Sequence, residues 1–198
     1  DFCKEAALLW PGDLPPLTGK LSLLDFEVCI DDGEWQTWES NVPSMDIESH
    51  KVLATDIVIP TVDTVRHVQV LQGWLSSHSP LILCGPPGSG KTMTLTSVLQ
   101  SMPELMLAAL NFSSGTTPDL ILKTFHQYCD YRSTRDGLVL SPTVPDKWLV
   151  IFCDEINLPV NDVYGTQKVI TFLRQLTEQG GFWREGTNDW VTLQRVQF

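Results

Sequence analysis

Basic residues, metal-binding cysteine motifs and long apolar runs are all scarce in this 198-residue sequence. Lysine and arginine together number 13, against 24 acidic residues, which gives a formal net charge of −11. A protein that coats nucleic acid needs clustered basic side chains to neutralise phosphates, so this composition argues against that class and against a nucleic-acid partner. It still allows one local phosphate pocket. No apolar stretch approaches the roughly 18 residues that a membrane-spanning helix needs, and no secretory signal is present, so we expect no membrane partner.

Cysteine is sparse, and its five copies are widely spaced: Cys3, Cys29, Cys84, Cys129 and Cys153. They form no CxxC pair and no cluster with histidine, so the sequence predicts no zinc site. Cys84 and Cys153 lie within apolar, strand-like runs, where a reduced cysteine is a small buried apolar side chain. This pattern is typical of a reducing compartment, and we expect a cytoplasmic protein.

The sequence divides into two segments of different character. Residues 1–56 contain several prolines and a short hairpin signal around the dipeptide Asp32-Gly33, which predicts a linker with a small β-hairpin. Residues 57–198 alternate helical and strand patterns, which predicts one α/β nucleotide-binding subdomain. The first residue is Asp1 and the last lies in a strand-like run, so we expect a piece of a larger protein.

The alternation in the second segment predicts a three-layer αβα fold around a parallel sheet, closed by a C-terminal β-hairpin. The predicted elements are a helix that begins after an N-cap at Thr61, a strand over 81–84, a helix over 91–101, a strand over 105–112, a helix over 118–129, a strand over 148–153, a helix over 166–179, and a hairpin formed by 182–183 and 190–198.

Residues 85–92 read Gly-Pro-Pro-Gly-Ser-Gly-Lys-Thr, a complete GxxxxGK[ST] phosphate-loop motif. Its glycines allow a tight backbone turn whose N–H groups point at phosphate oxygens, and the following helix adds its positive dipole end. Lys91 would reach the β- and γ-phosphates, and the Thr92 hydroxyl would ligate Mg²⁺. The predicted phosphate contacts are Pro87, Gly88, Ser89, Gly90, Lys91, Thr92 and Met93.

Two carboxylates follow the apolar run over 148–153, namely Asp154 and Glu155. The carboxyl end of a strand in a parallel sheet is the usual ligand crevice of open α/β folds, so both acids should lie near the phosphate loop. Asp154 would then hold Mg²⁺, and Glu155 would orient and deprotonate the attacking water. One metal-holding and one water-positioning acid suffice, because phosphoryl transfer depends mainly on positioning and charge stabilisation.

The sequences of five segments resemble those of a known family, the AAA+ modules of dynein motor heavy chains. These segments are Ile59–His67 (IPTVDTVRH), Gly85–Thr94 (GPPGSGKTMT), Asn111–Ser114 (NFSS), Cys153–Pro159 (CDEINLP) and Tyr164–Gln167 (YGTQ). The resemblance extends over nearly the whole chain and is greatest to the third module, of the cytoplasmic rather than the axonemal type.

This resemblance implies that ATP or ADP binds together with Mg²⁺. It assigns adenine contacts to Val58, Ile59, Pro60 and Thr61. It also assigns a restraining hydrogen bond on Glu155 to Asn111, which with Lys91 completes the predicted catalytic set.

The family also implies a role at the scale of the motor. Dynein heavy chains carry six AAA+ modules in a ring and move toward microtubule minus ends, and nucleotide turnover in the third module regulates that movement. The implied partners are the neighbouring modules, microtubules and accessory chains, and the implied location is the cytoplasmic cytoskeleton. Residues 1–56 would connect to the preceding module.

Several expectations stay open at this point. The sensor-one residue, the helical small subdomain and the neighbour's arginine finger would lie beyond Phe198, so this chain alone should be a weak or inactive ATPase. One alternative is a nucleotide-binding regulatory module with little turnover. Others are a different AAA+ ATPase, or a different P-loop class such as a clamp loader or a small-molecule kinase.

Overall fold

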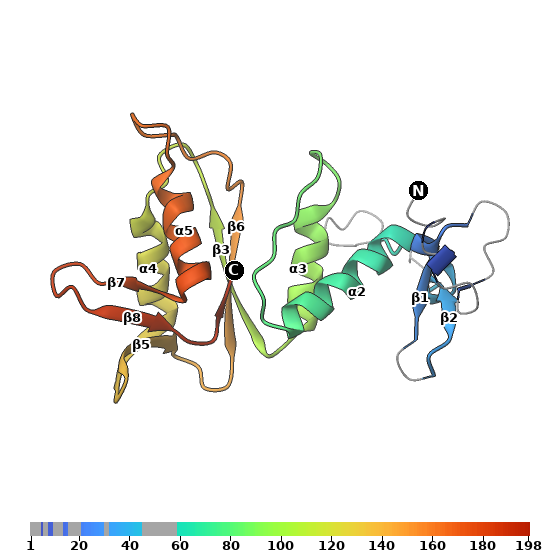
Figure 1. The fold of residues 1–198 in the computed structure, drawn as a ribbon, viewed down its shortest axis with the longest axis horizontal. Helices are drawn as coiled ribbons and strands as arrows, with labels where there is room; N and C mark the ends of the chain where they lie inside the picture. The colour runs from blue at the N-terminus through green and yellow to red at the C-terminus, as the bar shows by residue number, and fades with distance from the viewer. Residues whose placement is uncertain (1–4, 6–7, 10–13, 16–20, 30–31, 45–58) are drawn as a thin grey trace, which may run out of the picture. The chain divides into compact units, whose positions relative to one another are not determined.

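The computed structural model describes residues 5, 8–9, 14–15, 21–29, 32–44 and 59–198. The chain forms two compact units, Asp1–Leu71 and Gln72–Phe198 (Figure 1). The predicted boundary between linker and nucleotide-binding subdomain, at residues 56 and 57, lies outside the described residues, as does Val58. None of the helices in the described part of the chain is long and apolar enough to cross a membrane.

The first unit contains the predicted N-terminal hairpin. Strand β1 (Phe26–Val28) pairs antiparallel with β2 (Trp35–Thr37), and Gly33 turns the chain between them with a φ of 73°. Short 3₁₀ turns, η1 (Leu23–Asp25) and η2 (Trp38–Asn41), flank the two strands. The hairpin prediction is therefore confirmed.

Helix α2 (Val62–Ser76) begins where the sequence predicts. The Thr61 hydroxyl accepts the N–H of Thr64 at 3.2 Å, and the Thr64 hydroxyl accepts the N–H of Thr61 at 2.7 Å. These reciprocal bonds satisfy backbone donors that the first turn of a helix leaves free. They confirm Thr61 as the N-cap.

A parallel sheet forms the centre of the second unit. Strand β3 (Leu105–Asn111) pairs with β6 (Trp148–Asp154), which in turn pairs with the two-residue strand β9 (Val196–Gln197). The β6 strand is a continuous apolar run because both of its faces are covered, as is usual in parallel sheets. The predicted α/β P-loop fold with a parallel sheet is confirmed.

Helices lie on both sides of this sheet. Helix α3 (Lys91–Ser101) lies on one side, and α4 (Pro118–Tyr128) and α5 (Lys168–Gln179) lie on the other (Figure 1). Pro118 occupies the first turn of α4, and Gly180 ends α5 in a left-handed conformation, as the sequence predicts. The apolar faces of α4 and α5 meet the sheet in one core that includes Ile121, Phe125, Leu149, Ile151, Val169 and Leu176.

A second sheet contributes to the same core as α4 and α5. Its strands are β4 (Cys129–Thr134), β5 (Gly137–Pro142), β7 (Gly181–Trp183) and β8 (Trp190–Leu193), in the order β4-β5-β8-β7. The antiparallel pair β7–β8 confirms the predicted C-terminal hairpin. The β4–β5 hairpin is not among the predicted strands, although Asp136-Gly137 at its tip is a hairpin signal.

Two predicted strands are wrong. Residues 81–84 form no strand: Ile82 is 77% exposed, and Cys84 is exposed rather than a buried apolar side chain. Strand β9 is two residues long. One backbone hydrogen bond among the described residues joins segment 81–84 to this part of the chain, from the Leu81 N–H to the Phe198 carbonyl at 3.1 Å. The predicted strand over 190–198 is two strands in different sheets, because Arg195 has a left-handed φ of 55° that ends the extended run.

Candidate functional site

The phosphate loop has the backbone conformation that its glycines predict. Gly88 and Gly90 both have a φ of 77°, in the left-handed region that favours glycine. At Gly85, an added Cβ would lie 3.0 Å from the Ser89 hydroxyl oxygen and 3.5 Å from a methylene carbon of Lys91. The three glycines therefore keep open a narrow turn that a side chain would fill or strain.

Helix α3 begins immediately after this turn, with Gly90 as its N-cap residue. The first turn of α3 contains no acidic side chain, so the positive end of the helix dipole is not neutralised by a residue of the helix itself. Thr92 is exposed in this turn, whereas Thr94 is buried and donates its hydroxyl hydrogen to the Gly90 carbonyl at 2.9 Å. This arrangement is suited to binding an anion in front of the helix.

The Lys91 ammonium group turns back toward the loop. Its Nζ donates to the carbonyl oxygens of Gly85 and Pro86, both at 2.9 Å, and lies 3.4 Å from the Ser89 hydroxyl. These partners are neutral dipoles, so the positive charge of Lys91 is solvated by the loop without being neutralised. A phosphate oxygen would be a stronger partner, because hydrogen bonds between charged groups are about twice as strong as neutral ones.

The acidic pair lies at the carboxyl end of β6. Asp154 is the last residue of the strand, is half-buried, and stands opposite Asn111 in the parallel register. Glu155 follows with a φ of 54°, which is unusual for a residue other than glycine, and its N–H donates to Asp154 Oδ1 at 3.0 Å. After this turn the Glu155 side chain is exposed, whereas Asp154 is half-buried.

The predicted catalytic and metal-binding residues of the second unit occupy corresponding ends of their elements. The amino end of α3, which carries Lys91 and Thr92, and the carboxyl ends of β3 and β6 are at the same end of this unit in Figure 1. Asn111 and Asp154 are brought together directly by strand pairing. The hydrogen bond from Asn111 to Glu155 stays a prediction.

The predicted adenine contacts belong to the first unit. Ile59 is 61% exposed, and the Thr61 N–H and hydroxyl are both engaged in the α2 cap. A base contact by Ile59, Pro60 or Thr61 stays a prediction, and Val58 lies outside the described residues.

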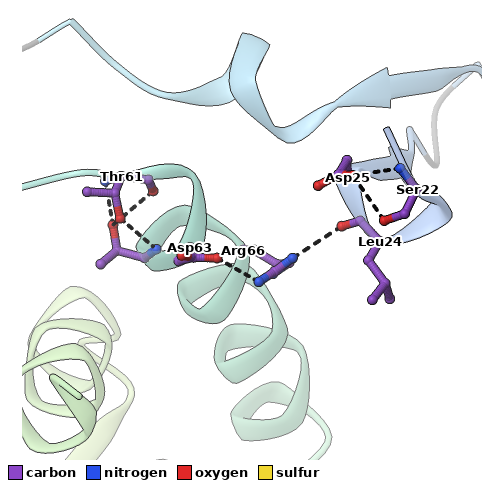
Figure 2. A network of polar contacts seen from close by, with 7 residues as sticks. Ser22, Leu24, Asp25, Thr61, Asp63 and Arg66 are labelled. Atoms are coloured by element: carbon purple, nitrogen blue, oxygen red, sulfur yellow. Dashed lines mark hydrogen bonds and ion pairs between the residues drawn. The ribbon is translucent and has the colours of Figure 1, made fainter. Parts of the chain in front are cut away.

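Figure 2 shows how the start of α2 is fixed within the first unit. Arg66 bonds Asp63 at 2.7 Å in the first turn and donates to the Leu24 carbonyl at 3.3 Å. Next to this contact, Asp25 accepts the Ser22 N–H at 2.7 Å, and that bond lowers the pKa of the Asp25 carboxyl. Arg66 thus links the helix that follows the predicted base-contact segment to the turn η1.

The loop that follows Glu155 contains an organising residue that the sequence analysis did not single out. Asp162 accepts the N–H groups of Tyr164 and Thr166 at 2.9 and 3.0 Å, and the Thr166 hydroxyl at 2.7 Å. The Thr166 hydroxyl bond, followed by its N–H bond, lowers the pKa of Asp162. An aspartate that bonds N–H groups two and four residues ahead is an Asx-type turn, so Asp162 with Gly165 was the available signal.

The side chains of the segment Tyr164–Gln167 hold this loop together. Thr166 is held by Asp162, and Gln167 donates from Nε2 to the Pro159 carbonyl at 2.7 Å. Val160 N–H donates to the Ser114 carbonyl at 3.3 Å, which ties the loop to the turn after β3. The result is an ordered loop directly after the acidic pair, with Tyr164 88% exposed on its surface.

A glycine turn that opens a helix, and two acids at the end of a parallel strand, define the P-loop class of nucleotide-binding α/β domains. Comparison with protein-family models identifies one family within this class. Residues 47–198 match the family model described as the P-loop containing dynein motor region, and the chain belongs to this family.

Proteins similar to this chain include cytoplasmic dynein heavy chains. The sequence is 60% identical over 184 residues to a cytoplasmic dynein heavy chain of Neurospora crassa, which covers 93% of this chain. It is 58% identical over 185 residues to that of Dictyostelium discoideum and 55% identical over 198 residues to that of Caenorhabditis elegans. In each case the chain spans only 4% of the relative's length.

Proposed function

We propose that this chain binds Mg·ATP at residues 85–92 and that, within a complete heavy chain, it hydrolyses the nucleotide. The observation that carries the proposal is the open glycine turn in front of α3, with left-handed backbone at Gly88 and Gly90 and an un-neutralised helix dipole. These features suit a triphosphate, because backbone N–H groups, a dipole and the Lys91 ammonium all favour anionic oxygens.

The donor set also suits a magnesium ion. Hard cations prefer oxygen ligands, and Thr92 offers a hydroxyl while Asp154 offers a half-buried carboxylate. When bound, the ion would supply charge neutralisation on the phosphates. Glu155 would act as the base toward water, and Asn111 beside Asp154 would restrain its orientation.

We further propose that the module is the regulatory third one of a microtubule motor, located in the cytoplasm with the cytoskeleton. The cytoplasmic dynein names of the relatives support the assignment to a cytoplasmic motor, and the resemblance of the motifs CDEINLP and YGTQ to the third module motivates the regulatory role. Its partners would then be neighbouring AAA+ modules, accessory chains and microtubules. Residues 1–56 would serve as the connection from the preceding module, and 57–198 as the nucleotide-binding large subdomain.

The test is Glu155→Gln in the complete heavy chain, compared with the neutral surface change Glu185→Gln. Loss of a positioned general base lowers turnover about 10²- to 10⁴-fold at that site, so we expect nucleotide to stay bound and movement along microtubules to slow. The measurements are nucleotide occupancy of this site and single-molecule velocity. Unchanged turnover at this site in Glu155→Gln would show that Glu155 is no catalytic base and would favour a module that binds nucleotide without turning it over. Reduced turnover with unchanged velocity would contradict the regulatory role but leave the proposed hydrolysis at this site in place.

A further inference from the structure

Gln197 is a polar residue at an almost fully buried position in β9, with 2% of its surface exposed. Its Nε2 donates to the Ser79 carbonyl at 2.7 Å and lies 3.5 Å from the Trp74 carbonyl. The Trp74 carbonyl belongs to the end of α2, 123 positions away in the sequence, and the Ser79 carbonyl to the segment after it, 118 positions away. A buried amide needs such partners, because an unbonded donor in the interior is costly.

Two further contacts hold the same short segment against the parallel sheet. The His78 ring stacks on the Trp148 indole with a centroid distance of 3.7 Å and an angle of 7°. The Leu81 N–H donates to the Phe198 carbonyl at 3.1 Å. Residues 78–81 are therefore attached both to the start of β6 and to β9.

Two of the three residues between this segment and Gly85 are exposed. Ile82 is 77% exposed, and Cys84, directly before Gly85, is exposed as well. Residues 78–81 are thus the stretch before Gly85 that the Gln197, Trp148 and Phe198 contacts hold to the sheet. The position of the loop relative to Asp154 depends on how firmly that stretch is held.

We propose that Gln197 is a positioning residue for the phosphate loop, a role that rests on the proposed nucleotide binding at residues 85–92. Its amide hydrogen anchors Ser79 and so fixes where the chain enters the loop. The anchoring bond comes from the Nε2 donor of the amide. The Gln197 Oε1 is buried without a hydrogen-bond partner among the described residues, so it adds no anchoring contact there. His78, stacked on Trp148, provides the second half of the same anchor.

The experiment follows hydrogen exchange by mass spectrometry in the complete heavy chain, using peptides over 78–84 and 85–95 during a titration with Mg·ADP. Gln197→Met keeps the length of the side chain and removes the donor. We expect faster exchange over 78–84 and a roughly five- to tenfold higher Mg·ADP concentration for half-protection of 85–95, as befits one lost buried hydrogen bond. Gln197→Leu should behave in the same way, because it also removes the donor.

Gln194→Met is the matched control, because Gln194 is exposed on the same stretch of chain, and it should leave both peptides unchanged. His78→Asn is an independent variant that removes the ring and keeps a residue type that tolerates the left-handed φ of 54°. It should also raise the half-protection concentration, and it keeps the proposal testable if the Gln197 variants do not accumulate.

The outcomes separate the two proposals. Absence of Mg·ADP protection over 85–95 in the parent would contradict nucleotide binding itself. Protection in the parent with an unchanged midpoint in Gln197→Met and in His78→Asn would overturn the positioning role. Faster exchange that extends to 105–111 in β3 would also overturn it, because Gln197 would then support the fold as a whole.

Discussion

Single glycines set the shape of the phosphate loop, because its backbone enters a region that other residues adopt only with strain. Gly90 combines a φ of 77° with the N-cap position of α3. Gly85 is limited instead by space, since a Cβ there would crowd the Ser89 hydroxyl. The loop is therefore sensitive to the smallest possible side chain at either position.

Gly90→Ala should destabilise the chain by about 1 kcal/mol, the price of a left-handed conformation for an L-residue, and weaken nucleotide binding. Urea unfolding and a Mg·ADP titration measure the two effects. Gly115→Ala is the matched control, because Gly115 has open space around its Cα and no positive φ. Equal behaviour of the two variants would contradict the strained-loop argument.

Three thiols differ in how burial controls their reactivity. Burial raises the pKa of Cys129 to about 11 and that of Cys153 to about 12, whereas Cys84 is exposed. The thiolate is the reactive form, so at pH 8 iodoacetamide should label Cys84 first and Cys153 last, as peptide mass spectrometry can show. Rapid labelling of Cys153 in the folded chain would contradict its burial.

The same two thiols make stability depend on alkaline pH. Their folded-state pKa values lie above the ordinary value of 9.0, so the folded state favours the protonated form. The contribution of these two thiols to the free energy of unfolding is complete below about pH 9. It is lost as the pH rises toward the folded pKa values near 11 and 12.

Among the structural elements, the loop after the acidic pair depends on one carboxylate. Asp162→Ala removes the acceptor for Tyr164 and Thr166, so exchange of these amide hydrogens should accelerate, as NMR or mass spectrometry can measure. Because hydrogen bonds lower the pKa of Asp162, the ordering should be present above its ordinary value of 3.8 and be lost as the pH falls through the lower folded value. Asn161→Ala is the control one residue away. Equal exchange in both variants would show that Asp162 does not order the loop.

Element prediction succeeded where the signal is local. Helix α3 has the predicted bounds 91–101, because the glycine turn of the phosphate-loop motif lies directly before it and Pro103 lies shortly after it. The acidic pair at the end of β6 was likewise readable from an apolar run that stops at two carboxylates. These signals need no knowledge of distant parts of the chain.

Prediction failed where an element depends on a distant partner or a single backbone angle. Residues 81–84 have the composition of a buried strand, but a strand also needs a paired neighbour, and in the structure this segment is exposed at Ile82 and Cys84. The sequence did not indicate that the strand run over 190–198 ends at Arg195, because arginine has no particular preference for a positive φ. The anchor between Gln197 and Ser79 spans 118 positions, which no local pattern reveals.

At the scale of the whole molecule, a ligand that binds only the folded chain should raise its stability. Mg·ADP at 100 times its dissociation constant adds about 2.7 kcal/mol, which for a chain of this size raises the melting temperature by roughly 5 to 10 °C. Differential scanning fluorimetry with and without Mg·ADP measures the shift. Lys91→Ala is the control, and an equal shift in that variant would place the binding elsewhere.

The two sheets of the second unit are joined by a crossing of two residues. Gln194 donates its N–H to the Leu140 carbonyl in the second sheet, and the Arg195 carbonyl accepts the Leu149 N–H in the parallel sheet. The β7–β8 hairpin, whose Phe182 and Val191 are buried in the core, is therefore followed by β9 after only two residues, and both of these residues are hydrogen-bonded. Strand β9 is thus bound to the second sheet through the residue pair 194–195 as well as to β6 by strand pairing.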